Sequence, residues 1–305
     1  MVKARQTGAA KLERLRGLDE GSPARVEYAL ELAAAESNQD VLQAALDVLA
    51  AADDPRARPV LLDRFASVAD GSGGPDPGCY LRVALLRSLR YLARPDDAAA
   101  LERGVTTYEF MPPFTGLTRG EVAAGLRSVA LVTLNEVDET LAGYHATRLL
   151  TDRYTSPMSG EPALTAVQVL AAQGHVLPLY SFVLRESAEG DASGASEVLG
   201  ESLRNLTPLP ASLLPALVEC YGDSRDEIVL LGLFDLLLVH ETRARYDEVV
   251  LDFLRATRLY NIFRYLVSAI VASRRADLTA RLEAMAAGEP DRVKAEILRD
   301  ALALR

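Results

Sequence analysis

The feature that most constrains the fold of this chain is a repeated junction between two leucine-rich helical segments. It is clearest in residues 45–66 (ALDVLAAADDPRARPVLLDRFA) and 85–105 (LLRSLRYLARPDDAAALERGV). In each, apolar residues at helical spacing run into a short turn of Asp and Pro, and a second helix follows. Proline suits the first turn of a helix because no donor is needed there, and aspartate can cap free N–H groups. The junction therefore predicts two helices joined by a tight turn.

The same junction recurs along the 305 residues. Similar segments lie at 133–144, 169–180, 203–217, 237–251 and 270–282. One apolar anchor precedes each turn, and the anchors are Leu49, Leu89, Leu134, Leu170, Leu206, Leu238 and Val271. Successive anchors are 40, 45, 36, 36, 32 and 33 residues apart. A period of about 30–45 residues that holds two helices is typical of an α-solenoid.

The composition agrees with an all-α fold. Hydrophobic residues make up 49% of the chain but aromatic residues only 6%, and tryptophan is absent. Alanine and leucine dominate, so residues that favour helices outweigh the β-branched residues that favour strands. A quarter of the residues are charged, which is normal for a globular protein.

With this periodicity and its DDP and RPDD junctions, the segment 20–304 resembles the HEAT-repeat family, including its phycobilisome-lyase-type variety. The resemblance implies a right-handed α-α superhelix of about seven to eight helical hairpins, in which the second helices face a concave groove. We expect a single domain over 1–305, with cap helices at 1–20 and 289–305. Polar residues of the second helices would line the groove and suit an acidic peptide or a carboxylate. They include Arg87, Arg127, Arg204, Asn205 and Arg264.

One connection, 104–118 (GVTTYEFMPPFTGLT), differs from the rest of the chain. Four large apolar side chains surround two consecutive prolines, which prevent a helix from continuing. They are Tyr108, Phe110, Met111 and Phe114. Exposed, they would mark an interaction site; folded back, they would fill the gap between neighbouring hairpins, which is the preferred interpretation. The other long connections, 69–79, 153–162 and 186–196, are expected on the same edge of the solenoid.

A second local feature is the stretch 255–275, which holds five arginines and no acid. Tyr260 and Arg264 lie four residues apart and so share a helix face. One interpretation is a patch that binds an anion or an acidic protein. The preferred one is a buried helix whose arginines reach water or pair with acids such as Glu248 or Asp252.

The net charge and the motifs narrow the possible classes of function. The net charge of −10 argues against a nucleic-acid partner. No catalytic, cofactor or metal motif is found, and the N-terminus lacks the apolar core of a signal peptide. We therefore expect a non-catalytic, cytoplasmic and, from the Ala/Arg-rich composition, bacterial scaffold that binds a protein or peptide and does not enter the membrane. The alternatives are a HEAT-fold enzyme, similar to DNA glycosylases or phycobilin lyases, and a nucleic-acid-binding module.

Overall fold

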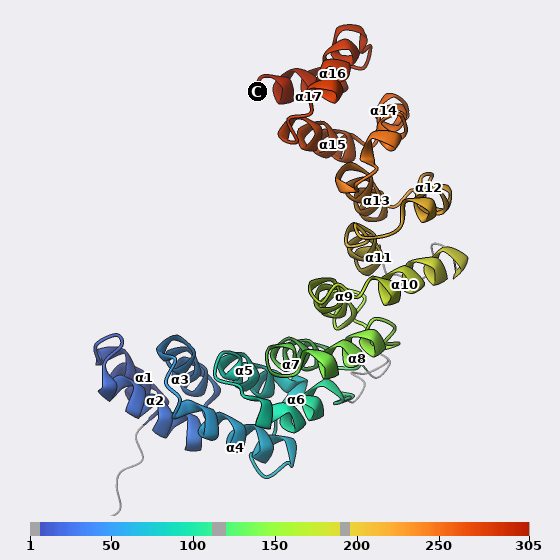
Figure 1. The fold of residues 1–305 in the computed structure, drawn as a ribbon. Helices are drawn as coiled ribbons and strands as arrows, with labels where there is room; N and C mark the ends of the chain where they lie inside the picture. The colour runs from blue at the N-terminus through green and yellow to red at the C-terminus, as the bar shows by residue number, and fades with distance from the viewer. Residues whose placement is uncertain (1–6, 112–119, 190–195, 305) are drawn as a thin grey trace, which may run out of the picture. The chain divides into compact units, whose positions relative to one another are not determined.

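The computed structural model describes residues 7–111, 120–189 and 196–304 (Figure 1). These residues form α-helices joined by turns and loops, and within them the only strand-like pairing is one isolated bridge, Phe110 to Glu121. The all-α class predicted from the sequence is confirmed. The sequence predicts one domain; by its internal contacts the chain divides into two compact units, Met1–Gln173 and Gly174–Arg305, and each is described by itself.

The first unit contains nine α-helices among its described residues. They are α1 (Gly8–Gly17), α2 (Pro23–Ala35), α3 (Gln39–Ala52), α4 (Ala57–Ala69), α5 (Tyr80–Leu89), α6 (Ala98–Val105), α7 (Ala124–Val137), α8 (Glu139–Leu149) and α9 (Ala163–Ala172). The odd-numbered helices pack in series, from α1 on α3 to α7 on α9. Each even-numbered helix packs on the odd-numbered helix that follows it, so the unit is a row of helical pairs (Figure 1).

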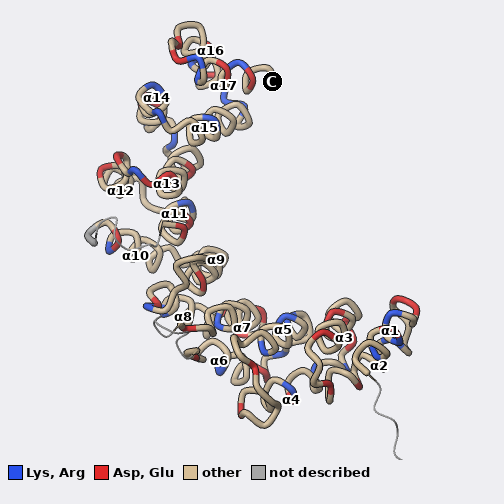
Figure 2. The backbone as a smooth tube through the Cα atoms, turned by 180° about the vertical axis from the view of Figure 1, so that it is seen from behind, with Lys and Arg blue, Asp and Glu red and all other residues tan. Residues whose placement is uncertain are grey.

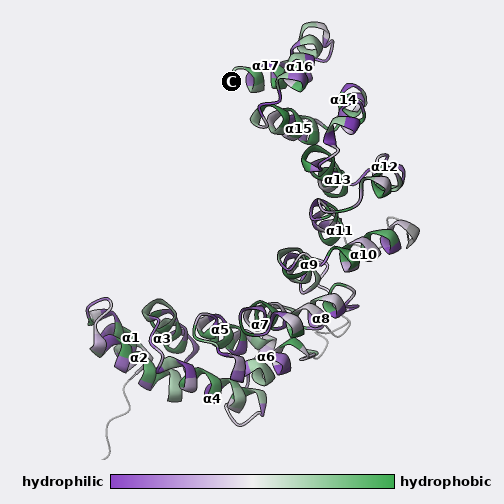
Figure 3. Ribbon diagram, in the orientation of Figure 1, coloured by the Kyte–Doolittle hydropathy of each residue, from purple (hydrophilic) through white to green (hydrophobic). Residues whose placement is uncertain are grey.

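The second unit has the same serial packing of odd-numbered helices. Its helices are α10 (Val176–Glu189), α11 (Ser196–Arg204), α12 (Leu214–Tyr221), α13 (Glu227–Val239), α14 (Asp247–Ala256), α15 (Tyr260–Ala272), α16 (Ala276–Gly288) and α17 (Arg292–Leu302). The series α11, α13, α15 and α17 forms one row, with α10 and α12 packed on its first two members. Helix α13, in the middle of the unit, is largely hydrophobic (Figure 3) and buries seven residues.

The seven predicted junctions all lie between two helices, which confirms that part of the sequence analysis. The first five anchors are almost completely buried, and the last two, Leu238 and Val271, are half-buried. At the RPDD junction, the Asp97 carboxylate accepts a hydrogen bond from the Arg94 N–H at 2.8 Å and also pairs with Arg58 of α4. Asp97, which directly precedes α6, thus connects the start of the α6–α7 pair to α4 of the preceding pair.

Two glycines set the close approach of α11 and α13. A Cβ on Gly232 would lie 2.7 Å from the Cα of Gly200, and a Cβ on Gly200 would lie 2.7 Å from the carbonyl oxygen of Ile228. No side chain fits at either distance, so the two helices can approach this closely only because both positions lack a Cβ.

The last helix, α17, is fixed by a buried lysine. The Lys294 ammonium donates hydrogen bonds to the carbonyl oxygens of Leu254, at 2.8 Å, and Arg255, at 3.0 Å, at the end of α14. It also lies 5.1 Å from the ring centre of Phe263. The last carbonyls of a helix lack partners within the helix and carry partial negative charge, so a cation is favourable there.

Candidate functional site

The proline-rich connection between α6 and α7 begins and ends as a short hairpin stem. The Met111 N–H donates to the Gly120 carbonyl at 3.0 Å, and the Val122 N–H donates to the Glu109 carbonyl at 2.9 Å. Residues 112–119, which include the predicted site residue Phe114, lie outside the described residues. The two sides of the stem each carry a carboxylate, Glu109 on the first and Glu121 on the second.

Arg82 of α5 holds the first side of the stem. Its guanidinium binds both oxygens of Glu109, at 2.5 and 2.9 Å, and its Nε donates to Asp76 at 2.9 Å. The Arg82 side chain is almost entirely buried, which strengthens these contacts because little water competes for them. The guanidinium beside Glu109 holds the pKa of that carboxyl below its ordinary value. The stem is thereby joined to the preceding long connection, in which Asp76 lies.

Arg127 of α7 holds the second side. Its two terminal nitrogens donate to Glu121 at 2.7 and 3.1 Å, and one of them also donates to the Thr107 carbonyl at 3.0 Å. Its Nε lies 3.3 Å from a carboxylate oxygen of Asp152, close enough for an ion pair although not aligned as a hydrogen bond. The exposed fractions of the Arg127, Glu121 and Asp152 side chains are 0, 5 and 4%. A fully buried cation thus sits between two buried carboxylates.

The aromatic residues of the stem pack on the next long connection. The Tyr108 hydroxyl donates to Asp152 at 2.9 Å and accepts from Arg148 of α8 at 2.7 Å, and its ring centre lies 4.2 Å from the Arg127 guanidinium. Burial and the hydrogen bond to Asp152 raise the pKa of Tyr108. The Tyr154 ring lies 5.7 Å from the Tyr108 ring and 5.1 Å from the Phe110 ring, centre to centre.

These contacts join three of the long connections in series, which is the arrangement expected for connections on one edge. The four apolar residues behave differently from one another. Tyr108 is partly buried and packed, as the preferred interpretation has it, whereas Phe110 and Met111 remain 42 and 38% exposed. The connection therefore packs at its base and presents apolar side chains farther along the stem.

A shallow cavity of about 530 Å³, widely open to solvent, lies beside these aromatic rings. It lies between the stem and the start of the connection that follows α8. The residues that line it are Tyr108, Phe110, Arg148, Thr151, Asp152, Arg153 and Tyr154. The sequence analysis did not predict the five lining residues between positions 148 and 154. The two acids that flank the apolar part of the connection, Glu109 and Glu121, were a signal that cations are buried at its base.

The predicted groove residues lie in both units, Arg87 and Arg127 in the first and Arg204, Asn205 and Arg264 in the second. The prediction that Arg127 lines a binding groove is wrong. Its side chain is fully buried between carboxylates, so no partner can reach it in this conformation. Arg87 of α5 and Arg264 of α15 are exposed, and neither forms an ion pair within the described residues. Figure 2 shows acidic and basic residues interspersed along the helices of each unit.

Arg204 and Asn205 belong to a hydrogen-bonded ladder in the second unit. The Arg204 guanidinium donates to Asp235 of α13 at 2.8 Å and to Glu201 at 2.5 Å, and the Asn205 amide also donates to Glu201. Asp235 accepts a further hydrogen bond from the Tyr265 hydroxyl of α15 at 2.8 Å. The ladder links three helices of the row, so these polar groups are already engaged within the protein.

The arginine-rich stretch 255–275 is partly neutralised. Arg255 pairs with Asp252 at 2.5 Å, and Arg275 pairs with Asp247 of α14. The predicted site residue Tyr260 is 38% exposed and donates its hydroxyl proton to Asp291 at 2.8 Å. Its pKa is raised by that hydrogen bond.

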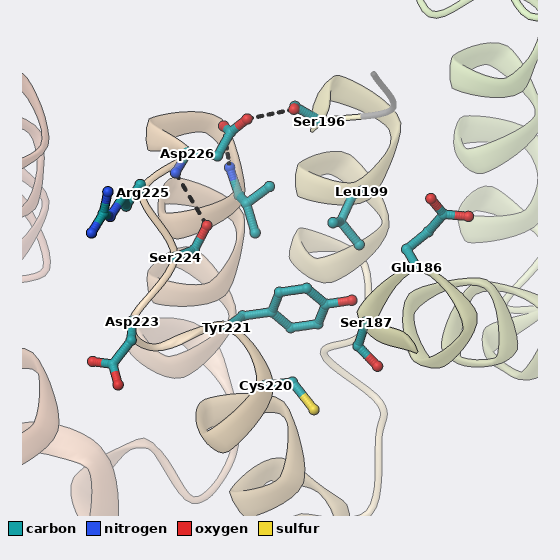
Figure 4. A pocket seen from close by; sticks show the side chains of 11 residues that line it. Glu186, Ser187, Ser196, Leu199, Cys220, Tyr221, Asp223, Ser224, Arg225 and Asp226 are labelled. Carbon is teal, nitrogen blue, oxygen red and sulfur yellow. Dashed lines mark hydrogen bonds between the residues drawn. The ribbon is translucent and has the colours of Figure 1, made fainter. Parts of the chain in front are cut away.

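A polar hollow of about 490 Å³ lies in the second unit (Figure 4). One of its three carboxylates, Asp226, caps α13, accepting from the Ile228 N–H at 2.8 Å, and also accepts from the Ser196 hydroxyl. Its tyrosine, Tyr221, donates to the Val183 carbonyl at 2.5 Å, and burial raises the pKa of that tyrosine to about 12. Asp226 thus stabilises the start of α13 and Tyr221 joins α12 to the middle of α10, and we assign no ligand to the hollow.

Two absences hold for the part of the chain that the structure describes. No group of three or more His, Cys, Asp or Glu residues is placed to hold a metal ion there. None of the described helices combines the length and the hydrophobicity needed to span a bilayer. Comparisons with models of protein families, with curated proteins and with solved structures find no match to the chain.

Proposed function

We propose that this protein is a non-catalytic interaction scaffold of the HEAT-like α-solenoid type, and that it binds a partner protein along the edge that carries its long connections. The observation that carries the proposal is the stem between α6 and α7. Two buried arginines hold its base, while Phe110 and Met111 stay exposed beside a cavity. Exposed aromatic and methionine side chains on a rigid support are characteristic of protein interfaces.

The solenoid part of the proposal is supported by the serial packing of odd-numbered helices within each unit. In a solenoid each repeat contacts only its neighbours, so proteins of this type are elongated. Small-angle X-ray scattering of the full chain tests this. A compact protein of this length has a radius of gyration of about 19 Å, and we expect a clearly larger value. A radius of about 19 Å would contradict the solenoid.

Site-specific photo-crosslinking in cells of the source organism tests the interaction surface. A photoreactive residue in place of Met111 is compared with one in place of Tyr91, which is 78% exposed in the short turn after α5. We expect a discrete adduct with a partner protein from position 111 and none from position 91. The same adducts from both positions, or none from position 111, would count against the edge as the binding surface.

A further inference from the structure

We propose that the cavity beside the stem binds a peptide segment that carries an aromatic side chain next to acidic residues. The proposal deepens the proposed function, on which it rests, because it names the chemistry of the partner segment. It depends on three properties of the cavity: its unpaired positive charge, its aromatic wall and its rigid base.

The charge at the cavity comes from Arg148 and Arg153. Arg148 donates to the Tyr108 hydroxyl at 2.7 Å and to the Val105 carbonyl at 3.0 Å, which leaves part of its five-donor guanidinium free for a ligand. Arg153 is exposed, and its contact among the described residues is the Tyr154 ring, 4.6 Å from the guanidinium carbon. Neither arginine forms an ion pair there.

The one carboxylate in the lining does not offset these cations. The Asp152 side chain is 4% exposed, lies 3.3 Å from the Arg127 Nε and accepts the Tyr108 hydroxyl proton, so it faces the interior of the protein. Arg127 is shared between Asp152 and Glu121, and with Arg148 and Arg153 these five charges sum to +1. The cavity therefore presents net positive charge on a chain whose overall charge is −10. Such a site favours an anionic ligand, and a guanidinium binds a carboxylate through two parallel hydrogen bonds.

The aromatic wall of the cavity favours contact with an apolar, preferably aromatic, group on the same ligand. Phe110 packs edge-on against Tyr154 and is 42% exposed, so part of its ring remains open to a ligand. On α8, Tyr144 is 75% exposed and lies four residues before Arg148, hence on the same face of the helix. Tyrosine, phenylalanine, methionine and arginine are the residues enriched in the centres of protein interfaces.

The rigid base explains why the site can bind a short segment. The Arg127 cluster holds Thr107, Glu121 and Asp152 in place before any ligand arrives. A site that is already ordered loses less conformational entropy on binding, which leaves more of the contact energy as affinity. In the expected complex, an aromatic side chain lies against Phe110 and a neighbouring carboxylate bridges to Arg153 or Arg148.

Fluorescence polarisation with three labelled decapeptides and the full-length protein tests the proposal. The first peptide places one phenylalanine among aspartates and glutamates, the second replaces the phenylalanine with alanine, and the third replaces the acids with lysines. We expect the first peptide to bind at least about tenfold more tightly than the other two, and its affinity to fall as salt is added, because exposed charges are screened. Equal binding of all three peptides, or no binding of the first, overturns the proposal.

The variants R148Q/R153Q and R153Q assign the binding to this cavity. We expect about a tenfold loss of affinity for the acidic peptide from the double variant and a smaller loss from R153Q, which removes no hydrogen bond within the described protein. R87Q is the matched control, an exposed arginine of the same unit on α5. Unchanged affinity in R153Q and in the folded double variant, or an equal loss in R87Q, overturns the assignment.

Failure of this inference can be told apart from failure of the proposed function. If the crosslink from position 111 forms equally well in the R148Q/R153Q background, the protein binds a partner there but not through this chemistry. If the acidic aromatic peptide binds as expected and no cellular adduct forms, the proposed ligand preference of the cavity is supported and the proposed scaffold function is contradicted.

Discussion

Replacing Arg127 with methionine removes a cation that lies, fully buried, between two buried carboxylates. Methionine has a similar length and fills much of the same space, so the main change is electrostatic. Glu121 and Asp152 would keep their charges in a place that water scarcely reaches, and the carbonyl of Thr107 would lose a donor. Breaking a buried ion pair in this way typically costs about 3–5 kcal/mol.

We therefore expect R127M to lower the free energy of unfolding by about 4 kcal/mol. For a unit of about this size, that corresponds to a fall of about 8–16 °C in its melting temperature. Thermal and urea unfolding of the full-length chain, followed by circular dichroism at 222 nm, measures both quantities.

Two further variants separate charge from packing. The triple variant R127M/E121Q/D152N removes the uncompensated charges, so it should recover a large part of the lost stability. R127K keeps the charge but loses the two-pronged geometry, so it should lie between the wild type and R127M. A loss of unfolding free energy below about 1 kcal/mol for R127M, or a triple variant as unstable as R127M, would refute this account of the Arg127 ion pairs.

Three other outcomes follow from the structure. G232A should destabilise the second unit by about 1–3 kcal/mol or more, because its methyl group would meet the backbone of Gly200; a melting temperature within one degree of wild type would contradict this. In native protein at pH 8, one thiol should react with a disulfide reagent, and two after denaturation: Cys220 is exposed, whereas burial raises the pKa of Cys79 to about 12. The pKa of Glu109 is lowered by its arginine partner, so its stabilisation is present above the ordinary value near 4.5 and is lost as the pH falls through the lower folded value. Between pH 5 and pH 3, the melting temperature should therefore fall less steeply with decreasing pH for E109Q than for wild type.

The helices and their turns were predictable because the signals for them are local. Apolar spacing identifies a helix over three or four turns, and an aspartate or asparagine at its start satisfies N–H groups only two or three residues away. Asn38 before α3 and Asp138 before α8 do this, at 3.1 and 2.9 Å. The anchors Leu49 and Leu134 are buried for the same reason, since their neighbours on the stripe determine which face turns inward.

The candidate site was predictable only in part. The proline pair and its aromatic neighbours drew attention to 104–118, but Phe110 and Met111 lie at the surface and are not folded back as the preferred interpretation expected. The partners that hold this connection come from distant segments. Arg82 meets Glu109 across 27 residues, and Tyr108 meets Asp152 across 44. No local pattern encodes these contacts, because they arise when α5, α7 and α8 pack beside one another.

Two arginines show where local sequence stops being sufficient. Leu86-Arg87-Ser88 and Leu126-Arg127-Ser128 are the same tripeptide, 40 residues apart, and both lie in odd-numbered helices of the same row. The amino-acid sequence alone determines that both are helical and that both leucines are buried. Only the tertiary structure decides that Arg87 is exposed to water while Arg127 is fully buried. The reason is that packing brings two carboxylates to Arg127, and a guanidinium remains buried only where such partners compensate its charge.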